Sequence, residues 1–133
     1  MTGFSMKISK RLVVSASHRI AGHKKCGNTH GHNFLVKVEI IVNDSHLSGE
    51  GYLLDFGRVE ELIVSKLDHK DLNQVLGLDS VTCEILALEI VKMLNQEFTR
   101  VWQNRPRSIK VTVWETPNSS AQVAVGEAIY EQD

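Results

Sequence analysis

Apolar and polar positions alternate along the first third of the chain, as they do in strands that bury one face. This alternation predicts one strand over residues 7–16 and a second, with a clearer pattern, over residues 34–42. The apolar face of the second strand comprises Phe34, Val36, Val38 and Ile40. The following stretch is rich in Asn, Asp, Ser and Gly, which indicates a turn or loop.

The middle of the chain changes to the three- and four-residue spacing of amphipathic helices. A first helix is predicted over residues 56–67, with Asp55 as its N-cap. A second helix is predicted over residues 81–98, capped by Asp79 or Ser80. The residues expected on its inner face are Ile85, Leu88, Leu94 and Phe98.

The last third returns to alternation after Pro106, which ends the helical pattern. It predicts a strand over residues 109–113 and another over residues 123–130. The order β-β-α-α-β-β favours an α+β fold, with two helices packed on one face of a mainly antiparallel sheet. With 133 residues, the chain is expected to form a single domain, 1–133.

Composition narrows the possible functions. A net charge of −1 and only 6% aromatic residues argue against a nucleic-acid binder. No apolar run is long enough to span a membrane, and the N-terminus lacks a signal-peptide pattern, so a cytoplasmic protein is expected. The charges are unevenly spread, however: residues 1–38 carry seven bases and no acid. This asymmetry indicates either an anion-binding region or a basic strand beside an acidic neighbour.

Histidines supply the first candidate chemistry. His30 and His32 are two residues apart, so in a strand their side chains share a face, and that face continues the buried face of the second strand. If the first two strands pair antiparallel, His18, just beyond the first strand, can reach both. Three imidazoles with a fourth position open are typical of catalytic zinc. His23 and His46 are expected to be ordinary surface or core residues.

The two cysteines, expected as free thiols, differ in their surroundings. Cys26 lies among Arg19, Lys24 and Lys25, whose charge favours a reactive thiolate, whereas Cys83 at a helix start is expected to be inert. Cys26 as a fourth ligand of a purely structural zinc is an alternative. Such sites usually hold several thiolates.

An Asp-His pair follows the first predicted helix. Asp68 could orient His69 and form a proton-transfer unit, provided that both turn toward one cleft. The alternative is a solvated helix end, where a histidine interacts favourably with the helix dipole. Position alone favours this alternative.

Six motifs together resemble the 6-pyruvoyltetrahydropterin and 6-carboxytetrahydropterin synthase family, in the family's order and over nearly the whole chain. They are SHRI around His18, C-x3-HGHN, LLDFG at 53–57, LDHKDLN at 67–73, TCE at 82–84 and WET at 114–116. The resemblance implies the tunnelling fold (T-fold) and trimers that stack into hexamers. The three-residue gap between Cys26 and His30 resembles the carboxytetrahydropterin branch of queuosine biosynthesis.

The resemblance also implies site roles. His18, His30 and His32 would bind Zn2+, Cys26 would be the general base, and Asp68 with His69 would transfer a second proton. Glu115 would anchor the pterin ring, and Thr82, Cys83 and Glu84 would line the same pocket.

The implied reaction converts 7,8-dihydroneopterin triphosphate to 6-carboxy-5,6,7,8-tetrahydropterin and releases acetaldehyde and triphosphate. The alternatives are the pyruvoyl product, an aldolase acting on dihydroneopterin, and a noncatalytic pterin-binding or structural zinc protein. Three histidines also accept other divalent ions. Ser17, Thr29 and a longer tail after Glu115 depart from the family pattern.

Overall fold

Four antiparallel strands form one sheet whose spatial order follows the chain, β1-β2-β3-β4. The computed structural model describes residues 4–43, 46–102 and 106–126. The strands are β1 (Ser5–His18), β2 (His30–Asn43), β3 (Ser108–Thr116) and β4 (Ser119–Gly126). The predicted α+β fold is confirmed, and β1 and β4 lie at the two edges of the sheet.

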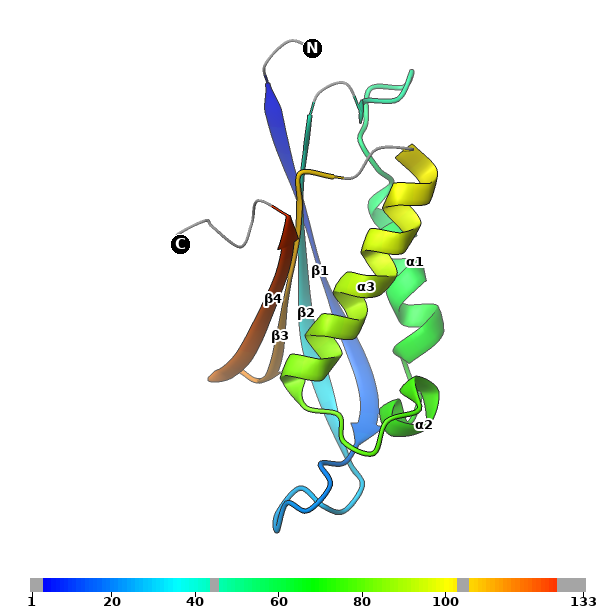
Figure 1. Ribbon diagram of the computed structural model, residues 1–133. Helices are drawn as coiled ribbons and strands as arrows, with labels where there is room; N and C mark the ends of the chain where they lie inside the picture. Colours follow the sequence, from blue (N-terminus) through cyan, green and yellow to red (C-terminus); the bar gives the residue numbers. More distant parts are fainter. Residues whose placement is uncertain (1–3, 44–45, 103–105, 127–133) are drawn as a thin grey trace.

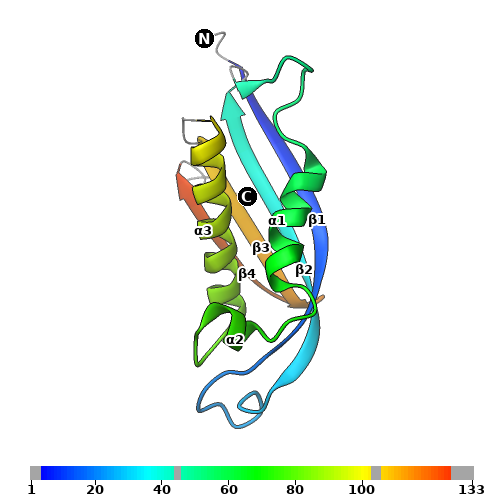
Figure 2. The same ribbon diagram turned by 90° about the vertical axis from the view of Figure 1, so that its right-hand side faces the viewer.

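The helices cover one face of this sheet (Figures 1 and 2). They are α1 (Phe56–Leu67), α2 (Leu72–Leu76) and α3 (Cys83–Trp102). α1 lies against β1, and α3 packs on β3 and β4. The apolar faces of strands and helices meet between these layers, where Phe34, Ile63 and Leu94 are fully buried. Among the described residues, no helix is long and apolar enough to cross a membrane.

Helix caps follow local sequence. Asp55 caps α1 as predicted, since its carboxylate accepts a hydrogen bond from Gly57 N at 2.8 Å. At α3, the predicted caps Asp79 and Ser80 are wrong: the Thr82 hydroxyl accepts from Ile85 N at 3.1 Å. α2 was not predicted, because five residues are too few for a periodic signal.

The predicted inner face of α3 is partly wrong. Leu94 and Phe98 are buried, but Leu88 is 40% exposed and Ile85 is only partly buried. A helix that packs on a sheet buries a wide stripe, and here the stripe follows four-residue steps through Leu86 and Ile90 to those two residues. Ile85 and Leu88 lie to one side of this buried stripe, which is why the prediction failed for them.

Strand boundaries also differ from prediction. β1 extends to His18 and β2 begins at His30, so both strands continue further toward their shared loop than alternation alone indicated. β4 starts at Ser119 rather than at 123, and residues 127–130 of the predicted strand lie outside the described part of the chain. The longer strands carry the histidines into the sheet itself.

Candidate metal centre and reaction pocket

The three predicted histidines meet where β1 ends and β2 begins. His18 and His30 are register partners in the antiparallel ladder, so His18 is the last residue of its strand rather than a residue beyond it. His32 lies two residues further along β2, on the same face. The centroids of the His18 ring and the other two rings are 4.6 and 5.1 Å apart. The expected convergence of the three imidazoles is therefore present.

Backbone carbonyls orient two of these rings. Nδ1 of His18 lies 2.7 Å from the carbonyl oxygen of Val81, and Nδ1 of His30 lies 2.8 Å from that of Asn28. A carbonyl oxygen only accepts hydrogen bonds, so each Nδ1 carries the proton. In the neutral ring the lone pair is then on Nε2, the arrangement that metal-binding histidines use.

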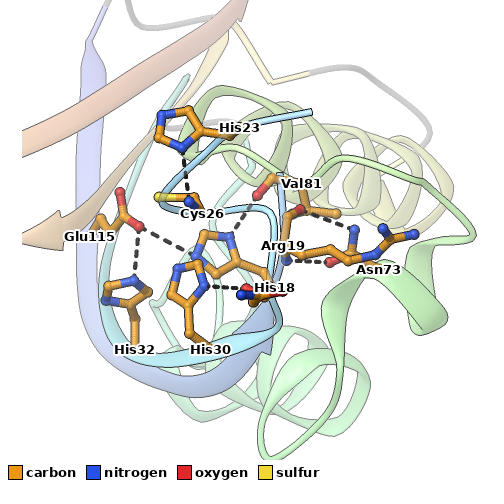
Figure 3. A network of polar contacts seen from close by, with 10 residues as sticks. His18, Arg19, His23, Cys26, His30, His32, Asn73, Val81 and Glu115 are labelled. Atoms are coloured by element: carbon orange, nitrogen blue, oxygen red, sulfur yellow. Dashed lines mark hydrogen bonds and ion pairs between the residues drawn. The ribbon is translucent and has the colours of Figure 1, made fainter. Parts of the chain in front are cut away.

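Glu115 joins this cluster from β3. Val113 pairs with Val36, and two further steps along β3 bring Glu115 to the histidine face of β2. Its Oε1 atom lies 2.9 Å from His32 Nε2 and 3.3 Å from His18 Nε2 (Figure 3). One ligand atom from each of these four residues lies within 4.8 Å of the others.

The donor set fits a divalent cation. Nε2 of His18 is buried and has no hydrogen-bond partner among the described residues, which is costly unless a cation binds to it. Burial lowers the pKa of His32 and outweighs the Glu115 carboxylate, which acts in the opposite direction. A neutral His32 is the form that binds a metal. Among the described residues, Glu115 rather than Cys26 is the fourth group of this cluster.

Cys26 lies in the loop that joins β1 to β2 and is a partly exposed free thiol. It borders a hollow of about 370 Å³ beside the histidine cluster. The residues that line this hollow are Lys25, Cys26, His30, His32, Glu115 and Thr116. Cys26 and Glu115 thus line the same hollow within a single chain.

The Asp68-His69 pair lies on the other side of His32. One carboxylate oxygen of Asp68 accepts from Ser15 N at 2.8 Å, and the other lies 3.5 Å from His69 Nε2. The His69 side chain is 82% exposed. His69 borders a separate hollow of about 530 Å³ together with His32. The structure therefore pairs Asp68 with His69 but does not bring them into the Cys26 hollow.

The segment Thr82–Glu84 is not part of the lining of the Cys26 hollow. The Thr82 hydroxyl caps α3, and the Glu84 side chain is exposed. The Cys83 thiol hydrogen-bonds to the backbone of Glu115, and burial raises its pKa to about 11, in keeping with the inert thiol expected there. This contact joins the start of α3 to the backbone of Glu115 in β3.

Two supporting residues were missed from the sequence. The Asn73 amide accepts from Arg19 N at 2.8 Å and donates to Arg19 O at 3.1 Å, which fixes the chain immediately after His18 (Figure 3). Val81 N also donates to Arg19 O, so the carbonyl that orients His18 is held in the same network. Asn73 lies within the quoted motif LDHKDLN, but a backbone carbonyl such as that of Val81 leaves no signal in sequence.

Known proteins are similar to this chain in sequence and in fold. A protein of Archaeoglobus fulgidus, provisionally named a 6-carboxy-5,6,7,8-tetrahydropterin synthase, is 36% identical over 77% of this chain and 91% of its own. The 6-carboxy-5,6,7,8-tetrahydropterin synthase of Bacillus subtilis is 27% identical over 87% of this chain and 83% of its own.

Among solved structures, the 6-pyruvoyl tetrahydropterin synthase of Plasmodium vivax has a TM-score of 0.71 at 18% identity, covering 92% of this chain and 99% of its own. That of Caenorhabditis elegans has a TM-score of 0.68 at 22% identity, covering 90% and 94%. These likenesses establish the T-fold. The family model described as 6-pyruvoyl tetrahydropterin synthase matches residues 7–125, and the chain therefore belongs to this family.

Proposed function

We propose that this protein is a zinc-dependent lyase that converts 7,8-dihydroneopterin triphosphate to 6-carboxy-5,6,7,8-tetrahydropterin, releasing acetaldehyde and triphosphate. The observation that carries the proposal is the hollow in which Cys26 faces His30, His32 and Glu115. A thiol, a metal-binding donor set and a carboxylate around one space are the groups that such proton-transfer chemistry needs. The names of the relatives in Archaeoglobus fulgidus and Bacillus subtilis support the same product, 6-carboxy-5,6,7,8-tetrahydropterin.

His18, His30 and His32 would hold the zinc through their Nε2 atoms. When bound, zinc supplies a Lewis acid that polarises substrate oxygens and acidifies the neighbouring carbon-bound protons. The carbonyls of Val81 and Asn28 keep two of the rings in the tautomer that leaves Nε2 free. Other divalent ions suit the same ligands, so zinc is the proposed ion on the family resemblance.

Cys26 would act as the general base. It lies beside Lys25 at the edge of the hollow that His30, His32 and Glu115 also line. A cytoplasmic location would keep this thiol reduced and usable. Removing a substrate proton would leave Cys26 as the neutral thiol, ready to be deprotonated again after product release.

Asp68 and His69 would form the second proton-transfer unit. The Asp68 carboxylate is held by Ser15 N, so it can orient the exposed imidazole of His69. This unit lies beside β1, an edge strand of the sheet. His32 borders both the His69 hollow and the Cys26 hollow, which makes it the link between the two proposed proton-transfer sites.

Glu115 would anchor the pterin, since a carboxylate accepts paired hydrogen bonds from a guanidine-like ring edge. The hydrogen bond between the Glu115 backbone and Cys83 would bring the segment Thr82–Glu84 near the proposed ring position. Lys25 at the hollow, the exposed Lys24 and the partly exposed Arg19 would attract the triphosphate. This gives the acid-free first 38 residues a function.

We also propose that the protein assembles from several copies, as trimers or stacked trimers. β1 and β4 both end the sheet, and exposed edge strands need pairing or protection. Pairing between copies would extend the sheet from one chain into the next. A monomeric mass in light scattering at micromolar concentration would contradict this assembly.

Two experiments test the reaction. The first is incubation of the zinc-loaded protein with 7,8-dihydroneopterin triphosphate, with the pterin product identified by mass spectrometry and acetaldehyde trapped as a hydrazone. Acetaldehyde with the carboxy product supports the proposal. Pyruvoyl product without acetaldehyde would assign the sister activity, turnover of unphosphorylated dihydroneopterin would indicate an aldolase, and no turnover would favour a noncatalytic pterin-binding or structural zinc protein.

The second experiment replaces the base. Cys26→Ala should retain fold and zinc yet lose turnover by about 10²- to 10⁴-fold, the usual contribution of general base catalysis. Circular dichroism and metal analysis establish that the variant is intact. Full activity in Cys26→Ala would remove the thiol from the mechanism.

A further inference from the structure

His23 lies three residues before Cys26 in the loop between β1 and β2, and its imidazole turns back onto that loop (Figure 3). Its Nδ1 atom accepts a hydrogen bond from Cys26 N at 2.8 Å and another from Lys25 N at 3.1 Å. An imidazole that accepts at Nδ1 carries its proton on Nε2. The loop therefore requires the tautomer of His23 that is protonated at Nε2. From the sequence, His23 was expected to be an ordinary surface or core residue.

Other backbone hydrogen bonds of the loop also hold Cys26 in place. Ile20 N donates to the Cys26 carbonyl at 2.8 Å, and His23 N donates to the Ile20 carbonyl at 3.2 Å. A Cβ atom at Gly27 would lie only 2.5 Å from the His23 carbonyl oxygen, so only glycine allows this approach. Cys26 is thus held at its own N–H and C=O groups, with close packing at the next residue.

We propose that His23 is a positioning residue for the Cys26 thiol. By accepting the amides of Lys25 and Cys26, it sets the turn that aims the thiol into the hollow lined by His30, His32 and Glu115. The proposal rests on the proposed function, because it gives His23 a catalytic consequence only if Cys26 is the base.

The effect of His23 on turnover should be much larger than its effect on the stability of the fold. The His23 side chain is exposed, and two exposed hydrogen bonds contribute too little to folding for their loss to unfold a domain of this size. The position of a reacting group is far more sensitive, since a displacement of about 1 Å can cost about 10²-fold in rate. Loss of the imidazole should therefore reduce turnover much more than stability.

Two variants at position 23 form a matched pair. His23→Asn places a side-chain oxygen close to the position of Nδ1 and can accept the same amides. His23→Leu has similar bulk and no acceptor. If the role is acceptance of these two hydrogen bonds, asparagine rescues and leucine does not. A role limited to filling space would predict the reverse.

The test combines thiol chemistry with kinetics on the zinc-loaded protein. Iodoacetamide alkylation of Cys26 is followed by peptide mass spectrometry, which distinguishes it from the buried Cys83. Turnover of 7,8-dihydroneopterin triphosphate gives kcat and KM. We expect His23→Leu to keep one zinc per chain, to alkylate faster at Cys26 as the loop opens, and to lose about 10- to 100-fold in kcat with little change in KM. His23→Asn should resemble the wild type in all of these.

The possible results distinguish a failure of the His23 proposal from a failure of the proposed reaction. Identical alkylation in the wild type and His23→Leu, or equal impairment of both variants, would overturn the role of His23. If the wild type does not turn over this substrate but alkylation still follows the leucine-asparagine pattern, the proposed reaction fails and the positioning of the Cys26 thiol by His23 stands.

Discussion

Glu115 and His32 join the end of β3 to the beginning of β2: Oε1 of the carboxylate lies 2.9 Å from Nε2 of the imidazole. The same oxygen lies 3.3 Å from Nε2 of His18, whose Nδ1 proton is already used by Val81. Two acceptor atoms at this distance repel each other unless a cation or a proton lies between them. The geometry of Glu115 therefore calls for a positive charge, either a bound cation or a proton, between the carboxylate and the imidazoles.

The first prediction concerns the metal ligands. His30→Ala should lose stoichiometric zinc, because it removes one of three imidazoles that converge on the site. Metal analysis after dialysis against a weak chelator measures this. His46→Ala is the matched control: His46 contacts the Asn43 carbonyl at the other end of β2, and its replacement should leave zinc content unchanged. One zinc per chain in His30→Ala would refute the ligand set.

The second prediction concerns pH and the stability of the metal-free protein. Burial keeps the folded-state pKa of His32 below its ordinary value of 6.5, so the unfolded chain binds this proton more readily. His32 thus contributes stability above about pH 6.5, and this contribution is lost as the pH falls through the folded-state pKa. Urea unfolding between pH 5 and 8 should show the free energy of unfolding falling on the acid side.

Glu115→Gln sharpens this second test. The carboxylate favours the protonated imidazole, so removing its charge should lower the pKa of His32 further. NMR titration of the His32 ring in the metal-free protein measures the shift directly. A higher pKa in Glu115→Gln would show that the carboxylate does not interact with His32 as the 2.9 Å contact indicates.

The sequence was sufficient to find the histidines, because their two-residue spacing continues the alternation of Phe34 and Val36 along one strand face. Antiparallel pairing then brings His18 opposite His30. What the sequence could not provide is the contact of Glu115 with this cluster, which depends on the register between β2 and β3. Register is a tertiary property, set by how complete faces pack.

The third prediction exploits the backbone at His69. This residue has a positive φ of 55°, a conformation that costs most side chains about 1–2 kcal/mol and that glycine adopts freely. His69→Gly should therefore be more stable than His69→Ala by about 1 kcal/mol in urea unfolding. Both variants lack the imidazole, so the comparison isolates the backbone term.

Activity should not follow stability in these two variants. Both lack the proposed proton-transfer group, so both should lose turnover to a similar extent. Such a pattern would mean that turnover depends on the imidazole of His69, whereas stability depends on its backbone conformation. Greater stability of His69→Ala than of His69→Gly would contradict the strain, and wild-type turnover in either variant would exclude His69 from the reaction.

The sequence also did not reveal which residues hold the loop and strand ends of the site in place. His23 was expected to be ordinary, yet it accepts two amides of the Cys26 loop. Asn73 was visible only as part of a motif, whereas its amide holds Arg19 from both sides. Such residues act through backbone groups, which every residue possesses, so their partners cannot be recognised from residue types alone.

The fourth prediction compares two glycines. In Gly27→Ala the new Cβ would lie 2.5 Å from the His23 carbonyl oxygen, so the loop must open and carry Cys26 away from its position. In Gly49→Ala the Cβ meets nothing within 4 Å. We therefore expect Gly27→Ala to reduce kcat by about 10- to 100-fold while zinc content stays at the wild-type level, and Gly49→Ala to leave both unchanged. Steady-state kinetics and metal analysis of the two variants measure this difference. Equal kcat values in both would mean that the close approach of Gly27 to His23 does not determine where the thiol lies.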